Sequence, residues 1–160
     1  MTLIKSISGI RGTIGGKPGE GLSPFDILKF SVAFGEWIKK DNPDISRQKI
    51  VIGRDARISG EMVYNIICGG LIGIGIDVVN IGLATTPTVE MAVVDLKATG
   101  GIIITASHNP AQWNALKLLN KNGEFLSSKD GEEVLGIADK IDNVEYSNVE
   151  DLGVITNDST

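Results

Sequence analysis

Short aliphatic runs alternate along this chain with longer segments in which apolar residues recur every three or four positions. The runs KIVIG, IDVVNI and GIIIT, at residues 49–53, 76–81 and 101–105, are typical of buried strands. Helical spacing after Ser23-Pro24 predicts a helix that ends before Asn42-Pro43, since serine is a good N-cap and proline fits the first turn. This alternation favours an α/β fold with a largely parallel sheet.

Three further segments combine helical spacing with residues that begin or end helices. Ser59 is expected to cap a helix over residues 60–73. Thr86-Pro87 opens another, which runs to about Lys97, and the last helix spans about 129–141. The first two connect successive strands, as crossover helices do in α/β proteins.

A fourth strand and two irregular stretches complete the prediction. The segment NALKLLN at 114–120 follows the third strand without a helix, so we expect these two strands to be antiparallel, with a hairpin-type turn afterwards. The glycine-rich residues 7–23 are expected to form a long loop, and residues 143–160 an extended tail or linker. The resulting fold class is α/β: a three-layer α/β/α sandwich with a mixed, mostly parallel four-stranded sheet.

Composition adds limits to this picture. The 160 residues suit one domain with a core of its own. Cys68 is the only cysteine, which excludes an internal disulfide, and its apolar surroundings indicate a buried side chain. The N-terminus has no signal-peptide pattern, and Asp77 and Asn80 interrupt the most apolar stretch, so we expect a soluble cytoplasmic protein without a membrane span.

Charge is distributed unevenly within the net value of −5. From Glu124 onwards there are ten acidic and two basic residues, whereas residues 1–123 carry thirteen basic and ten acidic ones. The mildly cationic body suits anionic small molecules. It has no cluster of lysine and arginine dense enough to predict nucleic-acid binding.

Polar residues follow two of the predicted strands at the ends where α/β proteins bind ligands. They are GRDARISG at 53–60 and TASHNP at 105–110, and Arg11 occupies the middle of the N-terminal glycine loop. These segments are expected to converge on one anion-binding site, although 53–60 also fits a charged turn that caps a helix. A serine hydrolase is disfavoured, because Ser107 and His108 are adjacent and no G-x-S-x-G motif surrounds the serine.

The strongest motif has a known counterpart. TASHNP with Asn114 and Lys117 closely resembles the active-site serine loop of the α-D-phosphohexomutases, namely the phosphoglucomutases, phosphomannomutases and phosphoglucosamine mutases. The resemblance extends over residues 4 to about 140 and includes three further segments: Gly9-Ile10-Arg11-Gly12, the GRDARISG loop and Thr86-Pro87-Thr88. It includes one departure, because Asn114-Ala115 stands where many members have Asn-Gly, so the local turn is expected to differ.

The resemblance implies a phosphoserine mechanism. Ser107 would carry a phosphoryl group, pass it to a hexose monophosphate, and recover the other phosphate of the resulting bisphosphate, so that phosphate moves between C1 and C6 or the equivalent amino-sugar positions. It also implies a Mg²⁺ ion held by the Ser107 phosphate and three carboxylates. The Asp-Gly-Asp-Gly-Asp motif that supplies those carboxylates does not occur in this sequence. Residues 1–142 would therefore be domain I of a larger enzyme and inactive alone.

The resemblance also suggests roles for individual residues. Lys117 would steady charge or assist proton transfer, unless it faces solvent on an edge strand. Arg11 would compensate phosphoryl charge, unless it forms a loop salt bridge, and His108 would orient the loop, move a proton or make a structural hydrogen bond. Further residues would bind phosphate or organise the loops: Asn109, Asn114, Arg54 and Asp55.

The expected ligands are hexose or hexosamine monophosphates and bisphosphates, and the expected partners are the remaining domains of the same enzyme. The short GIRGTIGG opening favours the bacterial phosphoglucosamine or phosphomannose branch. The alternative is a non-catalytic phosphosugar-binding or regulatory module on the same fold. The two differ in whether Ser107 becomes phosphorylated.

Overall fold

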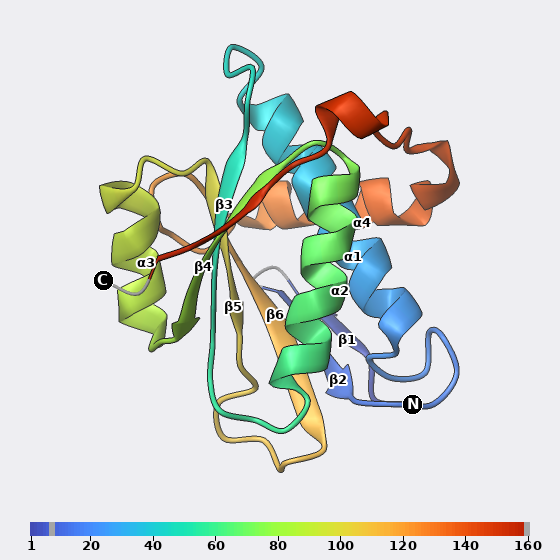
Figure 1. The fold of residues 1–160 in the computed structure, drawn as a ribbon. Helices are drawn as coiled ribbons and strands as arrows, with labels where there is room; N and C mark the ends of the chain where they lie inside the picture. Colours follow the sequence, from blue (N-terminus) through green and yellow to red (C-terminus); the bar gives the residue numbers. More distant parts are fainter. Residues whose placement is uncertain (7–8, 159–160) are drawn as a thin grey trace.

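The computed structural model describes residues 1–6 and 9–158, which form a mixed sheet between two helical layers (Figure 1). Within this part of the chain the sheet has seven strands in the order β1-β2-β6-β5-β3-β4-β7. The strands are Ile4–Ser6 (β1), Gly9–Thr13 (β2), Lys49–Arg54 (β3), Asp77–Leu83 (β4), Gly100–Ile104 (β5), Trp113–Leu119 (β6) and Ile155–Asn157 (β7). The helices are Pro24–Asp41 (α1), Gly60–Gly73 (α2), Thr86–Asp95 (α3) and Ser128–Asp139 (α4), with short 3-10 turns at Ile141–Asn143 (η1) and Val149–Asp151 (η2).

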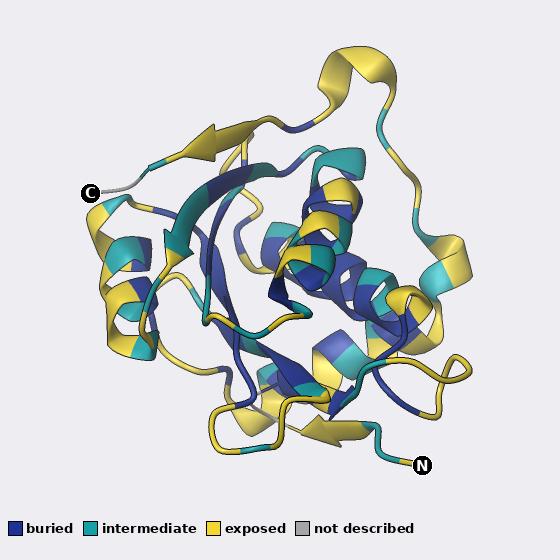
Figure 2. Cartoon of the chain, turned by 60° about the horizontal axis from the view of Figure 1, so that its bottom comes forward, coloured by how far each residue is buried: buried dark blue, intermediate teal, exposed yellow. Residues whose placement is uncertain are grey.

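Both faces of the central strands are buried, and alternate residues serve different cores. Ile50, Ile52 and Ile102 belong to a large core with residues of α1, α2 and α4, whereas Val51 and Ile103 pack with residues of α3. Successive side chains of a strand point to opposite faces, so a continuous aliphatic run fills both layers. The exposed residues in Figure 2 lie on the outer sides of the helices, in the loops and on the edge strands β1 and β7.

The prediction of an α/β sandwich with a mixed sheet is confirmed, but the predicted number of four strands is wrong. The four expected strands correspond to β3, β4, β5 and β6. Three more are present, and the six pairings divide evenly between parallel and antiparallel, because β6 pairs antiparallel with both β5 and β2, and β2 with β1.

The strand β2 lies within the glycine-rich stretch that was expected to be a loop. Glycine at position 9 is required by the pairing itself, since a Cβ at Gly9 would collide with the carbonyl oxygen of Leu116 on β6. Glycine is normally unfavourable in strands and marks sites of close backbone approach. The local composition of β2 therefore predicts a loop, whereas its partner strand makes it extended.

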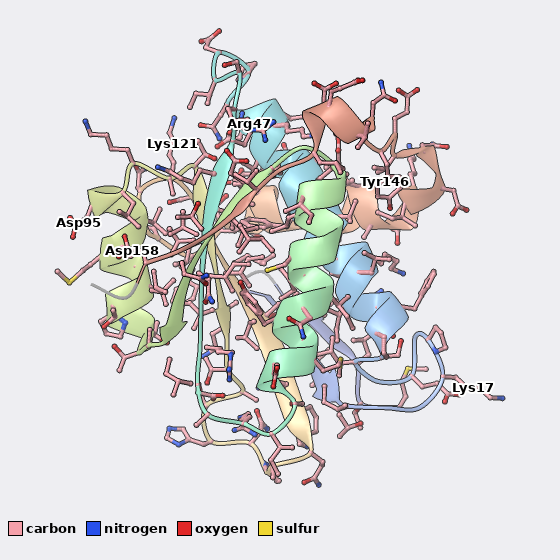
Figure 3. The ribbon with its side chains drawn as sticks, viewed as in Figure 1. Lys17, Arg47, Asp95, Lys121, Tyr146 and Asp158 are labelled. Carbon is pink, nitrogen blue, oxygen red and sulfur yellow. The ribbon has the colours of Figure 1, made fainter. Side chains whose placement is uncertain are left out.

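The C-terminal segment, expected as a tail or linker, contributes β7, which pairs parallel with β4. Arg47, labelled in Figure 3, donates from Nε to both carboxylate oxygens of Asp77 at 3.1 Å and from Nη2 to the carbonyl of Leu152 at 2.7 Å. Asp77 also accepts a hydrogen bond from the backbone N–H of Val154 at 2.9 Å. The segment is thus attached to the domain by side chains as well as by the sheet. The proposed boundary at residue 142 remains a prediction.

The predicted start of α1 is stabilised by a reciprocal cap. The Ser23 side chain accepts from the backbone N–H of Asp26, and the buried Asp26 carboxylate accepts from Ser23 and from the N–H of Gly19. This pair provides hydrogen-bond partners for backbone N–H groups that the first helical turn leaves unpaired, and it fixes the preceding loop. In the described residues, no helix is both long enough and apolar enough to cross a membrane.

The end of α3 provides a first test of the local energetics. Lys97 has a φ of 54° in the left-handed region, and the backbone bonds from Lys97 to Val94 and from Ala98 to Val93 form a Schellman motif. Replacing Lys97 with Gly should raise the free energy of unfolding by about 0.5–1 kcal/mol, because glycine adopts this conformation without a Cβ clash. Urea unfolding measures the change. Lys97→Ala, which keeps the clash, should leave stability nearly unchanged; equal effects of the two variants would contradict this account.

The single cysteine gives a second test. Cys68 is buried, and burial raises the pKa of its thiol, so the reactive thiolate is scarce in the folded protein. We expect an aromatic disulfide reagent to react negligibly over minutes in buffer and completely in denaturing urea. In the unfolded chain the thiol ionises near its ordinary pKa of about 8.5. The stability gained by burying the neutral thiol is therefore complete below that pH. It is lost as the pH rises toward the higher pKa of the thiol in the folded protein. Rapid modification of the native protein would show that Cys68 is accessible.

Candidate active site

Two loops lie side by side at the carboxyl ends of β3 and β5. The strands pair in parallel with Arg54 opposite Ile104, and the N–H of Asp55 donates to the carbonyl of Ile104 at 3.1 Å. Figure 1 shows the loop after β3 and the loop after β5 together at the lower end of the sheet. Parallel pairing therefore brings the segments 53–60 and 105–110 into contact, as their positions after strands predicted.

Ser107 occupies the exposed corner of the second loop in an unusual backbone conformation. Its φ is 52°, in the left-handed region that non-glycine residues rarely adopt. Its N–H donates to Thr105 Oγ1 at 3.1 Å, and its Oγ accepts a hydrogen bond from Lys117 Nζ at 2.8 Å. Such conformations persist only where surrounding contacts determine them, and they concentrate at functional sites.

Lys117 reaches Ser107 because β6 returns antiparallel beside β5. Leu116 and Leu118 belong to the core under α1, α2 and α4, so Lys117 between them points to the opposite face of the sheet. The strand β6 lies between β2 and β5, which excludes the alternative that Lys117 stands on an edge strand. Ala115, at the departure from the Asn-Gly pattern, lies in regular β6 pairing opposite Arg11.

These residues surround a hollow of about 290 Å³. Arg11 enters from β2 and Lys117 from β6, and no acidic residue contributes to the lining. A concave site with two cationic side chains and a hydroxyl suits a phosphate group. The full lining is Arg11, Thr105, Ala106, Ser107, His108, Asn109, Ala115 and Lys117.

Arg57, in the loop after β3, holds the serine loop at residues 105–110 in place. Its Nη1 donates to the carbonyls of Pro110 at 2.7 Å and Trp113 at 3.1 Å. Its Nη2 donates to the carbonyls of Ser107 at 3.0 Å and Asn109 at 2.8 Å. The exposed fraction of the Arg57 side chain is only 12%. One planar guanidinium thus ties four carbonyls of a single loop.

Asp55 fixes the other side of Ser107 through Thr105. The Thr105 hydroxyl donates to Asp55 Oδ2 at 2.6 Å, and Thr105 Oγ1 accepts from the N–H of Ser107. Asp55 also accepts from the backbone N–H of Arg57 at 3.1 Å and lies 3.3 Å from Arg57 Nε as an ion pair. The loop after β3 therefore holds the Ser107 carbonyl directly, through Arg57, and the Ser107 N–H indirectly, through Asp55 and Thr105.

The other expected site residues take different positions. His108 is exposed and lines the hollow without a hydrogen bond to the described residues, whereas the Asn109 N–H donates to the carbonyl of Ala106 within the loop. Arg54 does not line the hollow, since its Nη1 approaches the carbonyl of Asp55 at 3.4 Å beside the start of α2. Asn114 is fully buried and donates to Ser59 Oγ at 2.9 Å, which takes the place of the expected N-cap bond from Ser59.

The donor set in this chain does not fit a resident Mg²⁺ ion by itself. Among residues 1–6 and 9–158, no three histidine, cysteine or acidic side chains cluster closely enough to hold a metal. The nearest carboxylate in the loops, Asp55, is already used by Thr105 and Arg57. Magnesium prefers carboxylate and phosphate oxygens, so any ion here needs ligands beyond these side chains.

Comparison with known proteins identifies the family. Residues 3–145 match the family model described as phosphoglucomutase/phosphomannomutase, alpha/beta/alpha domain I. The chain belongs to this family. Its membership agrees with the resemblance carried by the serine loop, the arginine loop and the GRDARISG loop.

Relatives in this family are considerably longer. The chain is 42% identical over 120 residues to a phosphoglucomutase/phosphomannomutase of Thermococcus kodakarensis, a match covering 74% of this chain and 26% of the relative. It is 37% identical over 143 residues to a phosphoglucosamine/phosphogalactosamine mutase of Sulfurisphaera tokodaii, covering 88% of this chain and 29% of that protein. The chain therefore spans between a quarter and a third of these relatives.

Solved structures support the fold. A phosphoglucomutase/phosphomannomutase family protein of Burkholderia thailandensis superimposes with a TM-score of 0.77 at 22% identity, over 96% of this chain and 32% of that one. A structure described as a putative phosphomannomutase of Thermus thermophilus gives 0.76 at 24% identity, over 98% of this chain and 33% of that one. At this identity the likeness concerns the fold alone.

Two residues that organise the site were not assigned roles from the sequence. Arg57 and Thr105 both lie inside the motifs, but a sequence does not say which arginine of GRDARISG turns toward the neighbouring loop. A weak signal exists for Thr105, because a hydroxyl two residues before a polar corner often accepts a local backbone hydrogen bond.

Removing the Thr105 hydroxyl should loosen the serine loop. In Thr105→Val the N–H of Ser107 and the carboxylate of Asp55 each lose a partner, at a cost of about 1–3 kcal/mol. We expect the Ser107 amide to exchange hydrogen faster, as measured by NMR. Thr99→Val is the matched control, because Thr99 is also buried and bonds the backbone of Lys49 at the other end of β5. Unchanged exchange at Ser107 in Thr105→Val would show that this hydroxyl does not hold the loop.

Proposed function

We propose that this chain is the phosphoryl-carrying domain of a hexose-phosphate mutase. In this proposal Ser107 carries the phosphoryl group, and the substrates are hexose or hexosamine monophosphates. The observation that carries the proposal is the contact of 2.8 Å between Lys117 Nζ and Ser107 Oγ inside a hollow that Arg11 also lines. Family membership supports a mutase domain, since the relatives named above are mutases of sugar phosphates.

The proposed step exchanges one phosphorus–oxygen bond for another. The bond between Ser107 Oγ and phosphorus breaks, a bond from phosphorus to a sugar hydroxyl oxygen forms, and the sugar becomes a bisphosphate. One proton leaves the sugar hydroxyl and one reaches Ser107 Oγ, so the balance is neutral. Lys117 is within hydrogen-bonding distance to supply that proton. Return of the other phosphate to Ser107 completes the transfer between C1 and C6 or the equivalent amino-sugar positions.

The residues of the hollow have distinct tasks in this scheme. Phosphoryl transfer depends chiefly on positioning and on compensation of charge. Arg11 and Lys117 would compensate charge on the transferring group, and His108 is free to contact the sugar phosphate or move a proton. Arg54 and Asn114 would act as organisers of the loop and helix around the site, because neither lines the hollow.

A Mg²⁺ ion and further domains belong to the proposal. Bound to an oxygen of the Ser107 phosphate, the ion would supply Lewis-acid stabilisation of the transferring group. Its remaining ligands, and the contacts that select the sugar, would come from segments of the protein outside this chain, which covers 26% of one curated relative and 29% of another. The proposed setting is the cytoplasm. In isolation the fragment is expected to be inactive.

Phosphorylation of Ser107 by a sugar bisphosphate tests the proposal directly. In the full-length protein, a hexose 1,6-bisphosphate with Mg²⁺ should place one phosphoryl group on the peptide containing Ser107, as measured by peptide mass mapping. Ser107→Ala should abolish both this mark and mutase turnover, because no acceptor oxygen remains. The control is Ser46→Ala, which removes an exposed serine between α1 and β3 and should change neither.

The competing function predicts the opposite result. A phosphosugar-binding or regulatory module would bind hexose phosphates equally well with Ser107→Ala and would never become phosphorylated. A wild-type Ser107 that bisphosphate cannot charge in the presence of Mg²⁺ would replace the mutase with that module.

A further inference from the structure

We propose that Arg57 is a positioning residue for phosphoryl transfer: it imposes the left-handed conformation of Ser107 that directs its Oγ to Lys117, and it does not bind the substrate. This inference deepens the proposed function and rests on it. It concerns an arginine that the sequence motif leaves unassigned. The geometry of its five donors decides between anchoring and phosphate binding.

Every N–H group of Arg57 is either bonded to a backbone carbonyl or buried within the protein. A guanidinium has five N–H groups. Four of them donate to the carbonyls of Ser107, Asn109, Pro110 and Trp113. The fifth, on Nε, is buried without a hydrogen bond and lies 3.3 Å from Asp55 as an ion pair. Because Nε is buried and the other four donors are used, none is open to a phosphate oxygen, and Arg57 is not among the residues that line the hollow. Arg11 and Lys117 differ in this respect, because both side chains reach the hollow.

The hydrogen bonds of Arg57 act on the strained residue itself. The Ser107 carbonyl is held by Nη2, while the Ser107 N–H is held by Thr105, which is bonded to Asp55. Asp55 is in turn paired with Arg57. A serine at φ 52° relaxes toward negative φ unless both of its peptide groups are fixed. Removing Arg57 releases the carbonyl side and the loop as far as Trp113.

The consequence is a loss of reaction rate without a loss of binding. Relaxation of Ser107 would move its Oγ away from Lys117, and displacement of a reacting atom by about 1 Å can cost about a hundredfold in rate. Arg11, Lys117 and His108 would still face the sugar phosphate. Lysine cannot replace Arg57, because a single ammonium with three donors cannot reach four carbonyls in one plane.

The test is the single-turnover rate at which a hexose 1,6-bisphosphate with Mg²⁺ phosphorylates Ser107 in the full-length protein. Each phosphorylation rate is divided by the final fraction of Ser107 that becomes phosphorylated, so that only correctly folded molecules count. For Arg57→Ala we expect a fall of about a hundredfold in this rate and in kcat, with KM within about threefold of wild type. Arg57→Lys, which keeps the charge and the aliphatic stem, should lose at least about tenfold.

A second arginine provides a matched control. Arg47 also joins a carboxylate to backbone carbonyls, with Asp77 and Leu152, but it lies at the opposite end of the sheet from the serine loop (Figure 3). Arg47→Lys should therefore leave the charging rate and KM at wild-type values. Faster hydrogen exchange of the peptide 105–113 in Arg57→Lys, and not in Arg47→Lys, would further support the assignment.

Each remaining outcome decides against the inference. Charging by Arg57→Ala or Arg57→Lys within threefold of wild type would overturn the positioning role. A rise in KM with unchanged kcat would assign Arg57 to substrate binding instead. Equal losses in Arg57→Lys and Arg47→Lys would reduce the role to general stability. Failure of wild-type Ser107 to become charged is a separate result, which rejects the proposed function and this inference with it.

Discussion

The placement of β5 between a parallel and an antiparallel neighbour is the constraint on which the site depends. Its parallel pairing with β3 sets the ends of both strands at one edge, so the loop with Asp55 and Arg57 meets the serine loop. Its antiparallel pairing with β6 returns the chain along the other side and places Lys117 opposite Ile103. Neither arrangement alone would suffice: the parallel neighbour supplies the residues that fix Ser107, and the antiparallel neighbour supplies its cationic partner.

The hydrogen bonds around Ser107 act as one connected network. The left-handed backbone costs free energy that must be offset elsewhere, and a serine offers no intrinsic preference for it. The compensation comes from charge-assisted bonds between Arg57 and carbonyls, which are stronger than bonds between neutral groups. Because Asp55 joins Arg57 to Thr105, the restraints on the two sides of Ser107 are linked. Such linkage explains how an exposed corner keeps a defined geometry.

How far the sequence predicts this structure depends on where each element obtains its stability. The strands β3, β4 and β5 and the helix α1 carry their signal locally, in aliphatic runs and in the capping pair Ser23–Asp26, and were predicted to within a few residues. The strands β1, β2 and β7 are short, and every residue of β1 and β7 is exposed. The strands β2 and β7 pair with the distant segments β6 and β4, and β1 pairs with β2. No local pattern distinguishes them from loops.

The candidate site divides in the same way. Ser107, His108 and Asn109 became candidates because polar residues of these types follow a buried strand and match a family motif, whereas Lys117 became one through the motif alone. The direction of each side chain could not be predicted, since it depends on tertiary contacts. Arg54 and Arg57 stand three residues apart in one motif, yet Arg54 remains beside α2 while Arg57 crosses to the next loop. Asn114, expected either to bind phosphate or to organise the loops, is buried behind the loop and bonded to Ser59.

Charge balance connects the site to the length of the chain. Under the proposed function, a phosphoryl group on Ser107 brings a charge of about −1.5 to −2, which Arg11 and Lys117 are sufficient to offset. Arg57 contributes nothing to this balance, because its charge is paired with Asp55 and its donors are used by carbonyls. The second phosphate of a sugar bisphosphate is therefore left without a further lysine or arginine among the described residues of this lining. Under the proposed function, its compensation would come from the segments outside this chain that also complete the magnesium site.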